Sequence, residues 1–157
     1  MRKLKLYLET SVWNFYFADD APEKKEVTLQ FFEKVENGEF DIYISDIVFR
    51  EIARAPQEKE ALLLNLIEKY KPKELEVNEE VLELAQKYIK EAALPERAID
   101  VSRHVAVATV YEIDALISWN LKHLANLRRM ERINGVNLKE GYSKRLEIVT
   151  PMEVSND

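Results

Sequence analysis

The chain of 157 residues contains no cysteine. Without thiols it can form neither disulfides nor thiolate metal sites, and it has no cysteine nucleophile, which fits a reducing compartment. Glycine and proline are also scarce, with 3 and 5 residues, so we expect neither long linkers nor low-complexity tracts. The length suits one core of ordinary size. We therefore expect a single domain spanning residues 1–157.

Long apolar runs are missing as well. No segment approaches the roughly 18 apolar residues that a membrane-spanning helix needs. The apolar residues near the N-terminus are few and alternate with lysines, which does not resemble a signal peptide. Glycine-rich phosphate loops of the P-loop and GxGxxG types are absent too. These observations predict a soluble, cytoplasmic protein that does not act at a membrane.

Charge is unevenly distributed along the chain. The net charge is −6, but residues 121–145 carry seven Lys and Arg against two Asp and Glu. Such a basic segment on an acidic body can be a patch that contacts phosphates. The commoner explanation is the solvated face of a helix, and charge alone does not separate the two.

Apolar periodicity predicts alternating strands and helices. Strands are expected at residues 4–8, 41–45, 75–77, 114–118 and 146–150. Helices are expected at 12–18, 22–36, 47–55, 57–70, 79–90, 98–112 and 119–132, with a turn at 134–135. Thr10 or Ser11 is the expected N-cap of the first helix. Strands that alternate with helices predict an α/β fold with a mainly parallel sheet covered on both faces.

Polar residues gather where the predicted strands end. In open α/β sheets, ligands bind outside the carboxyl ends of the strands. Several acids and one amide from distant parts of the chain could therefore converge on one edge, and hard cations such as Mg²⁺ and Mn²⁺ prefer such oxygen ligands. The residues that follow strands are Glu9, Thr10, Ser11, Ser45, Asp46, Ser118 and Asn120, joined by Glu51 and Asp100 from helices.

Structural explanations exist for several of these residues. Glu9 can interact with the dipole of the helix that follows it, although an acid directly after a buried strand is costly without a cation. Glu51 can be a solvent-facing acid and Asp100 a first-turn acid of its helix. Asp46 is better explained as a capping residue and His104 as a core or supporting group than as metal ligands. Other residues for which we expect a purely structural role are Asp114, Trp13 and Trp119.

Four segments together resemble the PIN domain, and more narrowly a group of small prokaryotic PIN-like proteins with an SWN motif. These segments are LYLETSVW, SDIVFREI, HVAVAT and DALISWNLKHLAN, and the resemblance covers nearly the whole chain. It implies a three-layer α/β/α domain with strand order 3-2-1-4-5. It also implies a ribonuclease that uses Mg²⁺ or Mn²⁺. Many members of the family are toxins of toxin–antitoxin pairs, which implies an antitoxin partner and a homodimer.

Residue by residue, the resemblance assigns the metal to Glu9, Glu51 and Asp100, with Asn120 beside them. Glu9 is one methylene longer than the aspartate that the family usually has. Val101 stands where the family usually has a third aspartate, and Asp100 precedes it by one residue. One residue on a helix is about 100° of rotation. Because ligand charge sets much of the affinity for a hard cation, this difference predicts a weakened metal site and reduced activity.

The resemblance, taken with these residues, implies two alternative functions. The first is metal-dependent hydrolysis of RNA phosphodiester bonds, in which Thr10 and Ser11 orient water or phosphate. In that case the RNA backbone is expected to contact Lys122, Arg128, Arg129 and Arg132. The second is a catalytically impaired PIN-like module that binds RNA or a protein partner. A phosphatase or receiver domain fits less well, because those chemistries need an aspartate where Glu9 stands.

Overall fold

The computed structural model describes residues 2–155 and contains a five-stranded sheet in which every strand pair is parallel. The order is β3-β2-β1-β4-β5, which confirms the predicted order 3-2-1-4-5 and matches a PIN-like fold. The strands are β1 (Leu4–Leu8), β2 (Phe40–Ser45), β3 (Lys73–Leu75), β4 (Ala115–Ile117) and β5 (Glu147–Val149).

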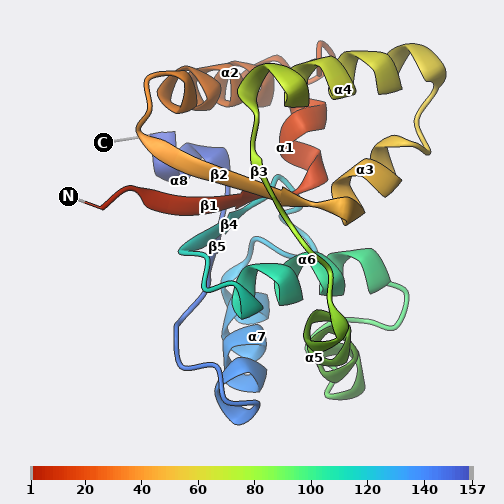
Figure 1. The fold of residues 1–157 in the computed structure, drawn as a ribbon, viewed down its shortest axis with the longest axis vertical. Helices are drawn as coiled ribbons and strands as arrows, with labels where there is room; N and C mark the ends of the chain where they lie inside the picture. Colours follow the sequence, from red (N-terminus) through yellow and green to blue (C-terminus); the bar gives the residue numbers. More distant parts are fainter. Residues whose placement is uncertain (1, 156–157) are drawn as a thin grey trace.

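Helices cover both faces of the sheet (Figure 1). The helices on one face are α1 (Thr10–Phe15), α2 (Pro22–Glu36), α3 (Asp46–Ile52), α4 (Gln57–Tyr70) and α8 (Pro151–Ser155). The helices on the other face are α5 (Glu79–Lys90), α6 (Ile99–Val110) and α7 (Leu127–Lys139). This arrangement gives three layers, α/β/α, as the alternating pattern predicted.

Alternation along the central strand divides the core in two. Successive side chains of a strand point to opposite faces. Leu6 and Leu8 of β1 accordingly pack with Trp13, Phe31 and other residues of the first helical layer. Tyr7, between the two leucines, belongs to the second cluster, formed with α5, α6 and α7. All three β1 residues are fully buried, so the strand end that follows them is fixed from both sides.

Helix starts at the sheet edge differ in part from the predictions. Glu9, rather than Thr10 or Ser11, is the N-cap of α1, and its side chain accepts a hydrogen bond from the Ser11 N–H. Ser45, rather than Asp46, is the N-cap of α3, and its hydroxyl accepts a bond from the Ile47 N–H; Asp46 is an exposed acid in the first turn. The carboxylate after β1 therefore both starts a helix and faces the carboxyl edge of the sheet.

The segment after β4 also differs from prediction. Residues 119–126 form turns, and α7 begins at Leu127 and runs through the Asn134-Gly135 pair where a turn was expected. The Asn134 side chain is buried and bonds to backbone groups of Met130 and Leu146. Tertiary hydrogen bonds thus override the turn preference of Asn-Gly. Among the described residues, no helix is both long and apolar enough to cross a membrane.

Candidate metal centre

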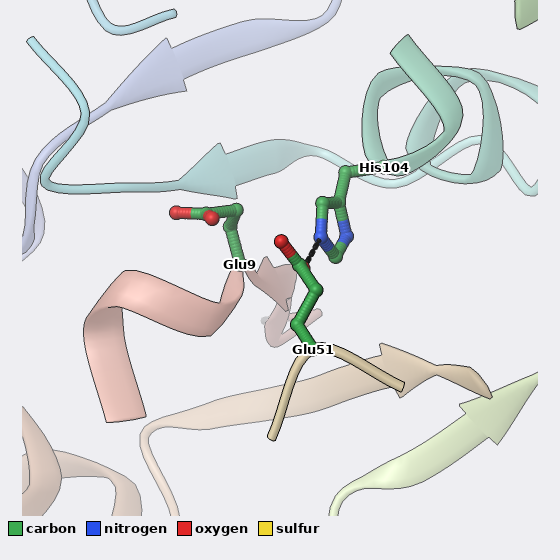
Figure 2. A group of neighbouring side chains, drawn as sticks. All are labelled: Glu9, Glu51 and His104. Carbon is green, nitrogen blue, oxygen red and sulfur yellow. Dashed lines mark hydrogen bonds and ion pairs between the residues drawn. The ribbon is translucent and has the colours of Figure 1, made fainter. Parts of the chain in front are cut away.

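Three side chains from distant parts of the chain meet at the carboxyl edge of the sheet (Figure 2). Glu9 follows β1, Glu51 lies in α3 and His104 lies in α6. One potential ligand atom from each lies within 4.8 Å of the other two. The strand β1 has β2 on one side and β4 on the other, so the chain reverses its direction of winding here. Ligands of open α/β sheets bind at such switch points.

Glu9 is held by hydrogen bonds on one carboxylate oxygen. Its Oε1 accepts bonds from the Ser11 hydroxyl at 2.5 Å, the Ser118 hydroxyl at 2.8 Å and the Ser11 N–H at 3.2 Å. Glu9 is only 7% exposed, and no Lys, Arg or His within residues 2–155 forms an ion pair with it. A buried carboxylate without a cationic partner is costly, so this environment favours a bound cation.

Glu51 is held in a similar way. Its Oε1 accepts bonds from the Thr10 hydroxyl at 2.6 Å and from His104 Nε2 at 2.5 Å. Burial acts to raise the pKa of Glu51, but the bond and charge of His104, the bond from Thr10 and the charge of Arg54 outweigh it. The pKa of Glu51 therefore lies below its usual value, and the side chain is a carboxylate at neutral pH.

His104 is itself positioned by a buried chain of hydrogen bonds. Its Nδ1 lies 2.6 Å from the Tyr7 hydroxyl, which lies 2.7 Å from the Ser45 hydroxyl. Burial raises the pKa of Tyr7 well above its usual value, so the phenol stays neutral. A phenol hydroxyl can donate one bond and accept another. Tyr7 can therefore donate to Nδ1 or accept from it, and both arrangements keep the imidazole ring in place.

The other predicted ligands lie differently. Asp100 is outside the group of three, and its carboxylate pairs with Arg54 at 2.8 Å. Asn120 Oδ1 accepts a bond from the His123 N–H, which closes a turn, while the Asn120 N–H donates to the Ser118 hydroxyl. Thr10 and Ser11, which we expected to orient water or phosphate, donate to the two glutamates. The structure thus brings Glu9, Glu51, Thr10 and Ser11 together and leaves Asp100 apart.

The basic residues predicted to hold RNA lie after β4. Lys122, Arg128 and Arg132 are exposed, in the turn segment and on α7. Arg129 is partly buried and donates a hydrogen bond to the Ala93 carbonyl oxygen, which joins α7 to the loop after α5. Three of the four are therefore free to contact a ligand, whereas Arg129 has a structural contact.

Sequence reasoning did not connect His104 with Glu51. The residue was expected to be a core or supporting group, and it is fully buried with its Nε2 bonded to Glu51. The missing signal was tertiary, because nothing in the spacing of residues 9, 51 and 104 shows that three elements meet. The expected structural role of Asp114 is consistent with its contacts, since its carboxylate accepts bonds from Arg2, Lys144 and the Lys5 N–H.

Comparisons with known proteins support the fold. No family model matches the chain, and no curated protein matches it in sequence. Among solved structures, the chain is similar to one described as VapBC2 from Rickettsia felis bound to a DNA fragment from their promoter. The TM-score is 0.57 and the identity is 14%, over 94% of this chain and 98% of that chain. At this identity the likeness shows a shared fold.

Proposed function

We propose that the protein is a metal-dependent ribonuclease that hydrolyses RNA phosphodiester bonds. The observation that carries the proposal is the buried Glu9 carboxylate, which has no cationic partner among the described residues and lies beside Glu51 and His104. Each glutamate uses Oε1 for hydrogen bonds to the protein, which leaves Oε2 for a cation. The PIN-like fold and the likeness to VapBC2 support a nuclease of this class.

The donor set suits either Mg²⁺ or Mn²⁺, because both ions accept carboxylate oxygens as ligands. Asp100, which the resemblance assigned to the metal, pairs with Arg54 instead. We therefore propose that Glu9 and Glu51 hold the ion and that His104 orients Glu51, because its Nε2 bonds to Glu51 Oε1 and its Nδ1 bonds to Tyr7.

The roles of the protein groups follow from their contacts. A bound divalent ion would supply an activated water and would stabilise negative charge on the phosphate oxygens. Ser11 and Ser118 orient Glu9, and Thr10 orients Glu51, through the bonds described above. Because the Thr10 hydroxyl donates to Glu51, it favours the charged form of Glu51 that a cation needs. The chain from Ser45 through Tyr7 keeps the His104 ring in one orientation.

The test is cleavage of single-stranded RNA by purified protein with Mn²⁺. We expect cleavage by the wild type and a loss of at least about 100-fold in Glu51→Gln, comparable to the loss of one charge-stabilising group in other enzymes. Glu58→Gln, on the exposed face of α4, makes the same chemical change away from the site and serves as control. Calorimetry is the second readout: Glu9→Gln should weaken Mn²⁺ binding to the protein.

Failure of this test would favour the second candidate, a catalytically impaired module. Its structural support is the small number of acids, since the group contains two carboxylates and Asp100 is engaged elsewhere. Absence of Mn²⁺ binding, together with RNA binding in a chelator, would overturn the ribonuclease and support the module. Cleavage by Glu51→Gln at the wild-type rate would exclude this site as the catalytic centre.

The partner proteins implied by the PIN resemblance also remain proposals. We propose an antitoxin partner, supported by the likeness to VapBC2, and a homodimer, supported by the resemblance alone. Co-purification with the product of a neighbouring small reading frame tests the first. Sedimentation of the purified chain tests the second, and a mass equal to one chain would overturn it.

A further inference from the structure

Four arginines line a hollow beside the candidate metal centre. Arg50 lies in α3 and Arg54 in the turn after it, whereas Arg97 lies in the loop before α6 and Arg103 lies in α6. The hollow has a volume of about 410 Å³, within the range of roughly 300–1,000 Å³ that is typical of small-ligand sites. It therefore has room for a nucleotide-sized group.

The hollow is strongly positive although the chain as a whole is negative. Asp100 is the one carboxylate in its lining, so four arginines face one acid. Asp100 pairs with Arg54, whose side chain is 65% exposed, and exposed pairs of this kind contribute little. Within residues 2–155, Arg50, Arg97 and Arg103 have neither an ion pair nor a side-chain hydrogen bond. Like charges gathered in this way favour an anionic ligand.

The hollow adjoins the candidate metal centre through shared elements. Arg50 directly precedes Glu51, and Arg103 directly precedes His104. The Arg54–Asp100 pair and the Glu51–His104 bond both join the α3 region to α6, and residues 100 and 104 lie about 6 Å apart along the axis of α6. A strand of nucleic acid with one phosphate at Glu51 would place a neighbouring phosphate near these arginines.

We propose that this hollow binds a backbone phosphate of single-stranded RNA next to the phosphate that is cleaved. The inference rests on the proposed function and assigns the substrate-positioning role to Arg50, Arg54, Arg97 and Arg103. Guanidinium groups bind phosphate through paired N–H donors, which fixes the ligand as well as attracting it. The weak pair with Arg54 allows a phosphate to displace Asp100. This positive site is distinct from the basic segment at 121–145.

The test is binding of a fluorescein-labelled single-stranded RNA, measured by anisotropy with EDTA so that no cleavage occurs. We expect the double variant Arg97→Gln/Arg103→Gln to bind at least about tenfold more weakly, since charge-assisted contacts are lost. The slope of log affinity against log salt should fall by about 0.7 for each lost contact, or about 1.4 in total. The matched control, Lys59→Gln/Lys69→Gln, removes the same charge from exposed positions of α4. Thermal unfolding verifies that both variants are folded.

Other outcomes separate this inference from the proposed function. If the arginine variant and the control bind RNA equally, the hollow is not a phosphate site and the inference falls, whatever the cleavage assay shows. An acidic peptide of the same charge is the competing ligand. If it binds the wild type as tightly as the RNA does, and its binding weakens equally in the arginine variant, the ligand is a protein and the RNA assignment falls. If the wild type binds RNA through the arginines but does not cleave it with Mn²⁺, the phosphate site stands and the ribonuclease falls.

Discussion

At the scale of single residues, the candidate site depends on how two glutamates are held. Glu9 accepts three hydrogen bonds on one oxygen, and Glu51 accepts two. The glutamate side chain has three rotatable bonds, so without these donors each carboxylate would sample several orientations. The bonds to Oε1 restrict the rotamers in advance, which lowers the entropy that metal binding would have to overcome. The longer side chain at position 9 is thereby held in place by the protein.

Ser118 is the residue on which this restriction can be tested. Its hydroxyl donates to Glu9 and accepts from the Asn120 N–H, so it links the strand end of β4 to the acid after β1. We expect Ser118→Ala to weaken Mn²⁺ binding by about 10–100-fold, the usual effect of losing a group that orients a ligand. Titration calorimetry measures the change. Ser143→Ala, at an exposed position, is the control; equal affinities in the two variants would show that Ser118 does not orient the site.

At the scale of elements, α7 shows how tertiary contacts override local preference. Asn134 Oδ1 accepts from the Leu146 N–H, and its Nδ2 donates to the carbonyl oxygens of Leu146 and Met130. The Asn134 side chain thus provides hydrogen-bond partners for the backbone N–H and carbonyl groups of Leu146, the residue just before β5. Gly135 beside it is exposed, and a methyl group added there would have no tertiary neighbour within 4 Å. Substitutions at these two neighbouring residues should therefore have opposite effects on stability.

Two substitutions in α7 separate these effects. Asn134→Ala should lower the free energy of unfolding by about 1–3 kcal/mol, because the buried Leu146 backbone groups lose their partners. Gly135→Ala should raise it by up to about 1 kcal/mol, because alanine favours the helix and meets no neighbour. Urea unfolding of both variants measures the difference. A destabilised Gly135→Ala would show that the helix is not continuous at this point.

At the scale of the whole molecule, two cores share one sheet. The apolar clusters on the two faces both include residues from β1, β2 and β4. We therefore expect the packing on the two faces to unfold together. Asp114 joins the opposite edge of the sheet, where its carboxylate contacts Arg2, Lys144 and the Lys5 N–H. Burial acts to raise the pKa of Asp114, but these partners outweigh it and hold the pKa far below its usual value. This carboxylate therefore links global stability to pH.

The sign of this linkage gives a prediction for acid unfolding. A depressed pKa in the folded state contributes stability above the unfolded-state value of about 3.9, and this stability is lost as pH falls further. Asp114→Asn should therefore have a lower free energy of unfolding than the wild type at neutral pH. The difference between the two free energies should become smaller below about pH 4. Urea unfolding across this range measures this difference. A difference in unfolding free energy that does not change with pH would contradict the linkage. The same experiment tests the domain prediction, since one cooperative transition is expected if residues 1–157 form one domain.

The sequence by itself determined the fold class and the strand-end residues. Periods of two and 3.6 are local properties, so β1, β2 and α4 were placed correctly, and the predicted sheet order followed from the PIN resemblance. Glu9 and Glu51 were likewise identifiable, since one follows a strand and both lie in quoted motifs. The ends of α1 and α7 were not, because the Glu9 cap and the Asn134 contacts depend on atoms that only the fold brings close.

Only the tertiary structure decided which polar groups meet. Asp100 and His104 lie on the same helix, four residues apart, and the packing of α6 against α3 turns one toward Arg54 and the other toward Glu51. Hydrogen bonds depend on direction and on distances of about 3 Å, which no linear spacing encodes. The sequence thus supplied the carboxylates and the arginines, and the fold separated them into a group around Glu9 and a positive hollow beside it.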